Sequence, residues 1–181
     1  MTARALFLDR DGVVNVDHGY VHRPDQVEFV PGIFDLVAAA CARQWAVVVV
    51  TNQSGIGRGY YGEAEFRKLT GWMRDRFAER EGRIDAVYHC PHHPHDALPE
   101  YRKDCTDRKP APGMLLRARD DLNLDLSNSV LVGDRPSDLE AARRAGVGIR
   151  LLFDPDGVES LPDEAGAIRI RSLPEAIAWL D

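Results

Sequence analysis

Short apolar runs alternate along this chain with longer segments in which apolar residues recur every three or four positions. The runs predict β-strands at residues 4–9, 46–51, 84–89, 128–133, 147–152 and 167–170. The longer segments predict helices at residues 31–44, 63–80, 112–122, 136–145 and 174–180. Several runs are apolar without interruption, so their strands are expected to be covered on both faces. The alternation favours an α/β fold, a Rossmann-like parallel sheet with helices on both faces.

The same pattern predicts a single domain over residues 1–181, because no repeat, low-complexity stretch or linker divides the chain. The connections after the first and second strands are too short for a separate cap domain, so the fold should be capless. Two segments, 12–30 and 90–111, show no helical pattern. Loops of this length in a compact domain are usually functional or disordered. We expect both to border a site, although the first could also be a solvated excursion.

Composition argues against several other classes of protein. Hydrophobic residues make up 44% of the 181 residues and charged residues 29%, as in an ordinary globular protein. The net charge of −6 disfavours non-specific binding to nucleic acid, and no apolar run approaches membrane-spanning length. No secretory signal precedes the first strand, which favours the cytoplasm. Only three cysteines occur, so a disulfide framework is not expected. We expect a monomer that acts on a small molecule, with no nucleic-acid or membrane partner.

Two carboxylates stand at the end of the first predicted strand. Asp9 and Asp11 follow its apolar run, and Gly12 allows a sharp exit of the chain. Open α/β sheets bind their ligands at the carboxyl ends of the strands. Two acids this close repel each other unless a cation or a proton lies between them. Oxygen ligands suit a hard divalent cation, so the pair predicts a Mg²⁺ site, although alone it could also be an acidic surface turn.

Further polar groups follow other predicted strands. Thr51 ends the second strand and begins a run of amides, a hydroxyl and a glycine that suits a cradle for phosphate oxygens. Arg108 and Lys109 precede the start of a predicted helix. Asp134 ends the fourth strand, and Asp138 follows four residues later. Each of these could be a capping or surface residue, but together they predict one phosphate site at one edge of the sheet.

The order of these groups resembles that of the haloacid-dehalogenase-like phosphohydrolases. That superfamily carries D-x-D, then Ser or Thr, then Lys, then G-D-x-x-x-D, and all four occur here. Longer matches at 8–12, 17–22, 51–56 and 90–94 resemble the heptose 1,7-bisphosphate 7-phosphatases, and this resemblance covers essentially the whole chain. The nearest related branch is the histidinol-phosphate phosphatase domain.

The resemblance implies a Mg²⁺-dependent phosphomonoesterase that removes the 7-phosphate of heptose 1,7-bisphosphate in heptose nucleotide precursor synthesis. Asp9 would be the nucleophile that forms an aspartyl-phosphate. Asp11 would protonate the leaving oxygen and then deprotonate the attacking water. Thr51 would form a hydrogen bond to the phosphoryl oxygens, and Lys109 would neutralise their charge.

The resemblance also implies the binding residues. Mg²⁺ would be held by Asp9, by Asp11 through its backbone carbonyl, and by Asp134. Asp138 would fix Lys109 or a metal ligand, or it would only lie on the face of a helix. The substrate would be bound by Asp17, His18, Gly19, Tyr20, Asn52, Gln53, Ser54, Arg108 and Arg135.

The second long loop carries a possible further metal site. Cys90-x-His92 and Cys105-x-Asp107 supply two pairs of residues, and thiolate and imidazole ligands suit tetrahedral Zn²⁺. The resembled family has Cys-x-Cys as its second pair, so Asp107 stands where a cysteine is expected. We expect a structural zinc ion with two thiolates, one imidazole and one carboxylate. Alternatively, another histidine of this loop replaces Asp107, or no ion is bound.

Two other functions fit parts of the pattern. A histidinol-phosphate phosphatase would place carboxylates opposite an amino group, whereas a second phosphate favours cations such as Arg108 and Arg135. A phosphoacceptor receiver module also combines acids, a threonine and a lysine on a parallel sheet. The D-x-D pair, which supplies an acid for a leaving group, and the metal loop both argue against a receiver.

Overall fold

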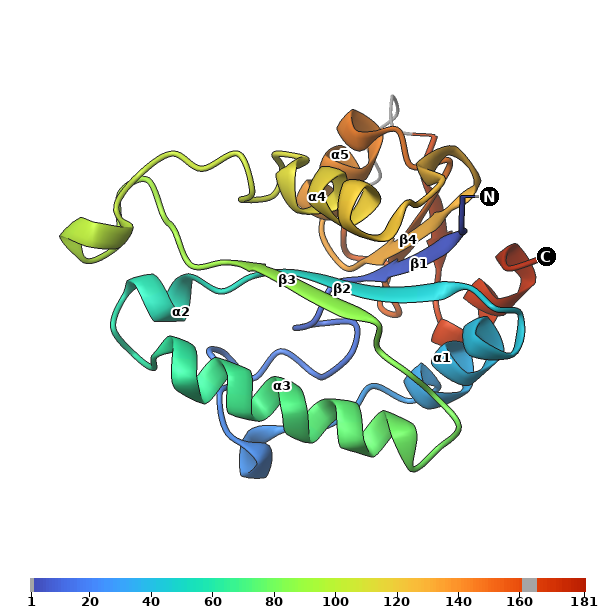
Figure 1. Cartoon of the computed structure of the whole chain (residues 1–181), viewed down its shortest axis with the longest axis horizontal. Helices are drawn as coiled ribbons and strands as arrows, with labels where there is room; N and C mark the ends of the chain where they lie inside the picture. Colours follow the sequence, from blue (N-terminus) through green and yellow to red (C-terminus); the bar gives the residue numbers. More distant parts are fainter. Residues whose placement is uncertain (1, 161–165) are drawn as a thin grey trace.

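The computed structural model describes residues 2–160 and 166–181, and its centre is a six-stranded sheet (Figure 1). The strand order is β3-β2-β1-β4-β5-β6, and neighbouring strands pair in parallel. The strands are β1 (Ala5–Leu8), β2 (Ala46–Asn52), β3 (Ala86–Cys90), β4 (Val130–Gly133), β5 (Ile149–Phe153) and β6 (Ile168–Ile170). The predicted parallel α/β fold is confirmed.

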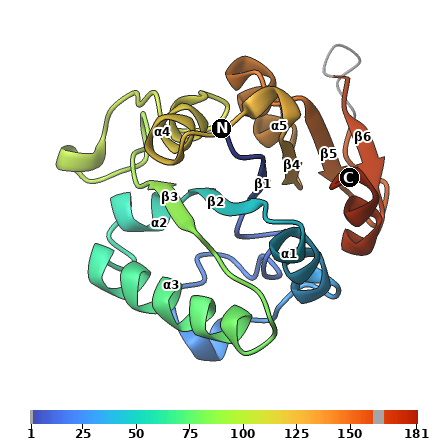
Figure 2. The ribbon, with the colours of Figure 1, turned by 45° about the vertical axis from the view of Figure 1, so that its right-hand side comes forward.

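Helices cover both faces of the sheet (Figure 2). They are α1 (Ile33–Ala42), α3 (Glu63–Ala78), α4 (Gly113–Leu122) and α5 (Pro136–Ala145). Successive residues of a strand face opposite sides. Leu6 and Leu8 accordingly pack in one core with α1 and α3, whereas Phe7 packs in a second core with α4 and α5. Burial on both faces explains why the strand sequences are uninterrupted apolar runs.

The predicted elements lie within two residues of the observed boundaries. Helix α5 ends at Gly146, as its sequence predicts, and this glycine has φ +84°. Helix α1 begins after Gly32, which has φ +87° and where a Cβ would lie 2.6 Å from Pro174. The last predicted helix is instead a 3₁₀ helix, η5 (Leu173–Trp179). The sequence did not reveal α2 (Ser54–Gly57), because a single turn is too short to show helical periodicity.

Two long connections leave the carboxyl edge of the sheet, where β1 and β3 end. Residues 12–30 contain only the short 3₁₀ helix η1 (Pro24–Gln26), and residues 91–111 contain η2 (Pro99–Tyr101). A further 3₁₀ turn, η3 (Leu126–Asn128), precedes β4. No helix among the described residues is both long and apolar enough to cross a membrane. The two long connections, residues 12–30 and 91–111, thus border the edge of the sheet where the sequence predicts the site.

Candidate active site

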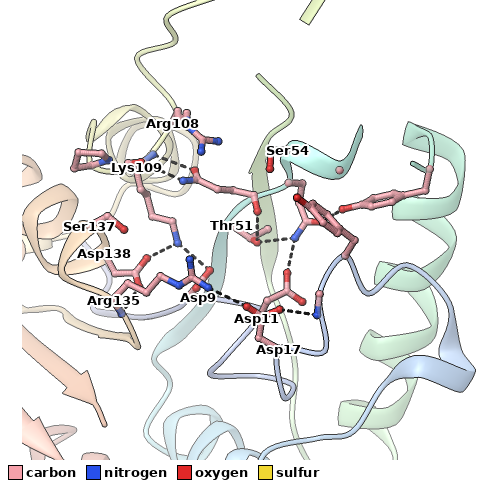
Figure 3. A pocket seen from close by; sticks show the side chains of 17 residues that line it. Asp9, Asp11, Asp17, Thr51, Ser54, Arg108, Lys109, Arg135, Ser137 and Asp138 are labelled. Atoms are coloured by element: carbon pink, nitrogen blue, oxygen red, sulfur yellow. Dashed lines mark hydrogen bonds and ion pairs between the residues drawn. The ribbon is translucent and has the colours of Figure 1, made fainter. Parts of the chain in front are cut away.

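The carboxyl ends of three adjacent strands bring the predicted catalytic residues together. β1 lies between β2 and β4, so Asp9, Thr51 and Asp134 lie at neighbouring strand ends. Figure 3 shows Asp9, Thr51 and Lys109 around one cleft, which has a volume of about 610 Å³. The parallel sheet thus converts three separate motifs into one site, as expected for this class of fold.

Lys109 joins two carboxylates at the base of this cleft. Its Nζ lies 2.8 Å from Asp9 Oδ1 and 2.6 Å from Asp138 Oδ1, and it donates to the Val50 carbonyl at 2.9 Å. Burial alone would lower the pKa of Lys109, but the charges of Asp138 and Asp9 outweigh burial and raise it. The ammonium therefore stays charged beside Asp9, the predicted nucleophile. Asp138 fixes Lys109, as the sequence predicted.

Three acids form a cluster that fits a divalent cation. Carboxylate oxygens of Asp9, Asp134 and Asp138 lie within 4.8 Å of one another. Burial, only partly offset by Lys109, raises the pKa of Asp9 to about 6. Burial and the neighbouring charges of Asp9 and Asp138 raise the pKa of Asp134 to about 8. Asp134 Oδ1 is buried without a hydrogen-bond partner among the described residues. Since buried polar atoms normally have a partner, a Mg²⁺ ion suits this position.

Two glycines allow these acids to approach each other. A Cβ on Gly12, which has φ +97°, would lie 2.1 Å from Asp134 Oδ2. A Cβ on Gly133 would lie 2.3 Å from the Cβ of Asp138. Any larger residue at either position would push an acid out of the cluster. This close packing is the physical reason why a glycine follows D-x-D at position 12 and why a glycine begins G-D-x-x-x-D at position 133.

Asp11 directs its carboxylate to donors from three residues. Arg10 Nη2 donates to Asp11 Oδ2 at 2.9 Å, and Asn15 Nδ2 donates to Oδ1 at 3.0 Å. Gln53 Nε2 donates to Oδ2 at 2.9 Å. The Asp11 side chain is therefore held in one orientation at the side of the cleft. Its predicted contact with Mg²⁺ involves only the backbone carbonyl, and it stays a prediction.

The end of β2 and the turn that follows it have two different tasks. Thr51, Asn52 and Ser54 line the cleft, as expected for a cradle. Asn52 also accepts a hydrogen bond from the Lys109 N–H at 3.0 Å and donates to the Lys109 carbonyl at 3.1 Å, which clamps that backbone to the sheet. Gln53 lines the cleft as well, and its contact with substrate stays a prediction. Its amide NH₂ group donates to Asp11 and Thr51, and the residue is buried.

The first long loop reaches the cleft through part of its predicted substrate-binding residues. Those that line the cleft are Asp17, Gly19, Tyr20 and, from the start of α5, Arg135. Arg135 Nη2 lies 3.0 Å from Asp17 Oδ2, so an ion pair fastens the loop to α5. His18 is not among the lining residues. Its Nε2 lies 2.9 Å from Glu28 at the exposed side of the loop.

The second long loop gathers three of its four predicted zinc ligands. The ligand atoms of Cys90, His92 and Cys105 lie within 4.8 Å of one another, and Cys90 Sγ is 3.8 Å from His92 Nδ1. Burial raises the pKa of Cys90 to about 12 and lowers the pKa of His92. A neutral imidazole beside two thiols that a metal can deprotonate fits Zn²⁺. Arg108 adjoins this group, donating to the His92 carbonyl at 3.1 Å while also lining the cleft.

Asp107, the predicted fourth ligand, lies outside this group. Its Oδ2 is 3.2 Å from Arg117 Nη2. A Cβ on Gly113 would lie 2.4 Å from Asp107 Oδ1, so the carboxylate packs against the first turn of α4. The positive end of a helix and an arginine on its next turn both attract a carboxylate. The Cys-x-Asp spacing could not distinguish a metal ligand from an acid at a helix N-terminus.

Several residues of the site were not predicted. Arg10 lies between the two acids of the first motif, but its bond to Asp11 cannot be read from the sequence. Asn15 and Tyr61 enter through hydrogen bonds to Asp11 and Gln53. Ser137 lines the cleft beside Asp138. Of these, only Arg10 has a local signal, its position inside D-x-D.

Comparison with known proteins agrees with this geometry. Residues 106–169 match a family model described as "HAD-hyrolase-like". The D-glycero-beta-D-manno-heptose-1,7-bisphosphate 7-phosphatase of Escherichia coli (strain K12) is 51% identical over 178 residues, which covers 96% of this chain and 93% of that protein. The chain belongs to the heptose 1,7-bisphosphate 7-phosphatase family. This confirms the resemblance inferred from the motifs.

Other members of the heptose bisphosphate phosphatase family match at similar coverage. The D-glycero-alpha-D-manno-heptose-1,7-bisphosphate 7-phosphatase of Burkholderia mallei is 46% identical over 180 residues, covering 99% of this chain and 95% of that protein. The crystal structure of D,D-heptose 1,7-bisphosphate phosphatase from B. bronchiseptica, complexed with magnesium and phosphate, has a TM-score of 0.83 at 33% identity. That similarity covers 98% of this chain and 97% of the other. Relatives named for either anomer therefore share this fold and length.

Proposed function

We propose that this protein is a Mg²⁺-dependent phosphomonoesterase that hydrolyses the 7-phosphate of D-glycero-D-manno-heptose 1,7-bisphosphate. The observation that carries the proposal is the buried Asp9 carboxylate, 2.8 Å from the Lys109 ammonium, at the floor of an open polar cleft. An acid beside a fixed cation can attack a phosphorus atom that carries negative charge, because the cation reduces the repulsion. The names of the relatives supply the substrate class.

The reaction proceeds in two steps on the residues of the chain. The Asp9 carboxylate attacks phosphorus, and the bond from phosphorus to the sugar oxygen breaks, giving an aspartyl-phosphate and an alcohol. Asp11 donates the proton that the leaving oxygen takes up, and then removes a proton from the water that hydrolyses the intermediate. Thr51 and Lys109 contact the phosphoryl oxygens. Asp9, Asp134 and the backbone carbonyl of Asp11 would hold Mg²⁺, which would supply charge stabilisation in the transition state.

Regioselectivity follows from the shape and charge of the cleft. The 7-phosphate lies on a flexible exocyclic carbon and can reach Asp9, while the sugar ring stays near the rim. Arg108 lines that rim, and its guanidinium can make a two-pronged contact with the 1-phosphate. Binding energy from this remote group helps to position the reacting phosphate. The 1-phosphate is therefore retained in the product.

The second long loop is proposed to bind a structural metal ion. Cys90, His92 and Cys105 would bind Zn²⁺, because their donor set and proximity suit it. Asp107 belongs to the first turn of α4 instead, and the ion would complete its coordination with a ligand from outside these four residues. The role of this zinc ion is to fix the loop that carries Arg108.

We also propose that residues 1–181 form a single domain and act as a monomer in the cytoplasm. The three cysteines are all unpaired thiols, which suits a reducing compartment. Size-exclusion chromatography with light scattering tests the monomer, and one cooperative unfolding transition tests the single domain.

A phosphate-release panel tests the function. Purified protein with Mg²⁺ is offered both anomers of heptose 1,7-bisphosphate, histidinol phosphate and a small monophosphate ester. We expect the highest kcat/KM for a heptose bisphosphate, and phosphorus NMR should show heptose 1-phosphate as the product. Heptose 7-phosphate as the product, or faster turnover of histidinol phosphate, would refute the assignment. A single phosphorylation without turnover would indicate a receiver module.

A further inference from the structure

The side chain of Gln53 lies between the acid of the reaction and the phosphate cradle. Only 2% of its surface is exposed. Its Nε2 donates to Asp11 Oδ2 at 2.9 Å and to Thr51 Oγ1 at 2.8 Å, so both hydrogens of the amide are used. Its Oε1 accepts a hydrogen bond from the hydroxyl group of Tyr61. Gln53 also lines the cleft, but all of these hydrogen-bond partners belong to the protein, so the site itself holds the amide in place.

Tyr61 fixes the orientation of the Gln53 amide. The Tyr61 hydroxyl is buried, and burial raises its pKa to about 12, so it remains a proton donor. A donor opposite Oε1 places the NH₂ end toward Asp11. In this orientation both amide hydrogens meet an acceptor, Asp11 Oδ2 and Thr51 Oγ1, whereas the reversed amide would turn its carbonyl oxygen toward them. One hydroxyl group thus determines which end of the amide faces the acid.

Tyr61 is itself held on two sides. Its ring stacks on His22 of the first loop, with 4.9 Å between centroids and 5° between planes. On the other side, a Cβ on Gly55 would lie 2.3 Å from Tyr61 Cε1, so only a glycine there lets the ring reach Gln53. The glycine of the cradle sequence therefore makes room for the residue that orients the amide.

The remaining groups around Asp11 show what Gln53 adds. Arg10 donates to both oxygens of Asp11 through Nη2, at 2.9 and 3.0 Å, and Asn15 donates to Oδ1 at 3.0 Å. Gln53 approaches Oδ2 from the side of Thr51, which lines the cleft. It alone connects Asp11 with the phosphate cradle among the hydrogen bonds of the described residues. Its amide therefore sets the distance between the proton donor and the phosphoryl group.

We propose that Gln53, oriented by Tyr61, is a positioning residue that aims the Asp11 carboxyl group at the leaving oxygen. This inference rests on the proposed phosphatase reaction. Its consequence is specific: loss of Gln53 impairs the transfer of the proton to the leaving group more than it impairs phosphorylation of Asp9. Substrates that differ only in how much their leaving group needs a proton separate the two effects.

The experiment compares benzyl phosphate with p-nitrophenyl phosphate. Neither carries sugar hydroxyls or a second phosphate, and the two are similar in size. Benzyl alkoxide needs a proton as it leaves, whereas p-nitrophenolate is stable as an anion. The quantity measured is kcat/KM, because it covers only the steps up to departure of the alcohol or phenol. Hydrolysis of the aspartyl-phosphate, in which Asp11 also acts, does not enter it.

For Gln53→Leu, which keeps the volume but removes the amide, we expect kcat/KM for benzyl phosphate to fall by about 10- to 100-fold. The value for p-nitrophenyl phosphate should fall by less than about fivefold. Tyr61→Phe should also lower kcat/KM more for benzyl phosphate than for p-nitrophenyl phosphate, but by smaller factors. The double variant Gln53→Leu/Tyr61→Phe removes the hydroxyl that Gln53→Leu leaves unpaired. Its kcat/KM values for the two esters should equal those of Gln53→Leu.

A double-mutant cycle with Asp11→Asn supplies the second test. If Gln53 acts through Asp11, adding Gln53→Leu to Asp11→Asn should cause little further loss. Equal losses on both substrates would show that Gln53 supports Thr51 or the fold, and would overturn the proposal. A loss on heptose bisphosphate alone would show a substrate contact, and would also overturn it. If the wild type hydrolyses none of these esters, heptose bisphosphate included, the proposed function itself fails. That result differs from both outcomes that overturn the role of Gln53.

Discussion

Lys109 and Asp138 form an ion pair of 2.6 Å at the base of the cleft, and both side chains are almost completely buried. The pair holds the ammonium 2.8 Å from Asp9. A buried charge that loses its partner costs much more than a broken surface pair. Asp138 is therefore expected to serve both the stability of the protein and the charge balance of Asp9, the proposed nucleophile.

We expect Asp138→Asn to lower kcat by at least tenfold and to lower the free energy of unfolding by about 3–5 kcal/mol, since one partner of a buried pair is removed. Urea unfolding and phosphate release measure the two effects. Glu140→Gln is the matched control, because Glu140 is an acid of the same helix that pairs with Arg143 and Arg144 at the surface. Surface pairs contribute little. Equal behaviour of the two variants would contradict the role of Asp138.

Asp9→Asn is expected to abolish turnover without unfolding the protein. The carboxamide has nearly the same shape but is a poor nucleophile and a weaker metal ligand. Asp11→Asn should lower kcat by about 100- to 10,000-fold through loss of proton transfer. Phosphate release by metal-loaded protein, with circular dichroism as the check of folding, measures both. Wild-type kcat in either variant would rule out the proposed chemistry.

Mg²⁺ binding should strengthen as the pH rises toward 8. Burial, followed by the charges of Asp9 and Asp138, raises the pKa of Asp134 from 3.8 to about 8. Between these values the folded metal-free protein holds a proton that the unfolded chain has lost. This group's contribution to stability is therefore full below about pH 4 and is lost as the pH rises to about 8.

Mg²⁺ competes with that proton, so its stabilising effect should grow over the same window. Thermal melts from pH 5 to 8, with Mg²⁺ or with EDTA, measure the gain in Tm. Asp134→Asn should be more stable than the wild type in EDTA at pH 8 and should gain little from Mg²⁺. A gain in Tm that is independent of pH, or is retained in this variant, would place the ion elsewhere.

The sequence predicts most of the fold because the strand pattern is strong. Uninterrupted apolar runs such as Val47–Val50 indicate burial on both faces, and all six predicted strands are present. Parallel strands align their carboxyl ends, so the acids and Thr51 could be assigned to one edge without knowing the strand order. The position of Lys109 beside Asp9 also follows from the motif order, although the two lie 100 residues apart.

The sequence could not predict where a polar side chain turns when several partners are within reach. Gln53 follows Asn52 in the cradle, yet one amide faces Asp11 and the other clamps Lys109. His18 and Asp107 carry the right chemistry for a site but pair with nearby charges instead. These choices depend on Glu28, Arg117 and helix ends, whose positions only the folded chain sets.

Arg108→Ala should reduce kcat/KM for heptose 1,7-bisphosphate by at least tenfold more than for a small monophosphate ester. The reason is that Arg108 lines the cleft and donates to the His92 carbonyl rather than to Asp9, so it is proposed to contact the second phosphate. Arg108→Lys should recover only part of the loss, since an ammonium cannot make the two-pronged contact.

Arg102→Ala is the matched control for this prediction. Arg102 braces the same loop through two hydrogen bonds to the Ala97 carbonyl, and it does not line the cleft. We expect Arg102→Ala to change kcat/KM for the bisphosphate and for the small monophosphate ester by about the same factor. If Arg108→Ala behaves in the same way, Arg108 only braces the loop through its bond to the His92 carbonyl.

The purified protein should contain about one zinc ion per chain, as a site built from cysteine and histidine ligands requires, and Asp107→Ala should not change this content. Three ligands, Cys90, His92 and Cys105, lie together, whereas Asp107 pairs with Arg117. Elemental analysis of protein prepared without chelator measures the stoichiometry. Cys105→Ser is the positive control and should lose most of the ion, because one thiolate of three ligands is removed.

Asp107→Cys completes the test, since it places a thiolate at the position of the fourth ligand in the family pattern. We expect this variant to hold zinc more tightly in competition with a chelator, and its Co²⁺ form should show stronger thiolate charge-transfer absorption than the wild type. Asp107→Ala should leave the Co²⁺ spectrum unchanged. Loss of zinc in Asp107→Ala would make Asp107 a ligand. Wild-type protein without zinc would mean that two thiols and one imidazole are too few to hold the ion in this loop.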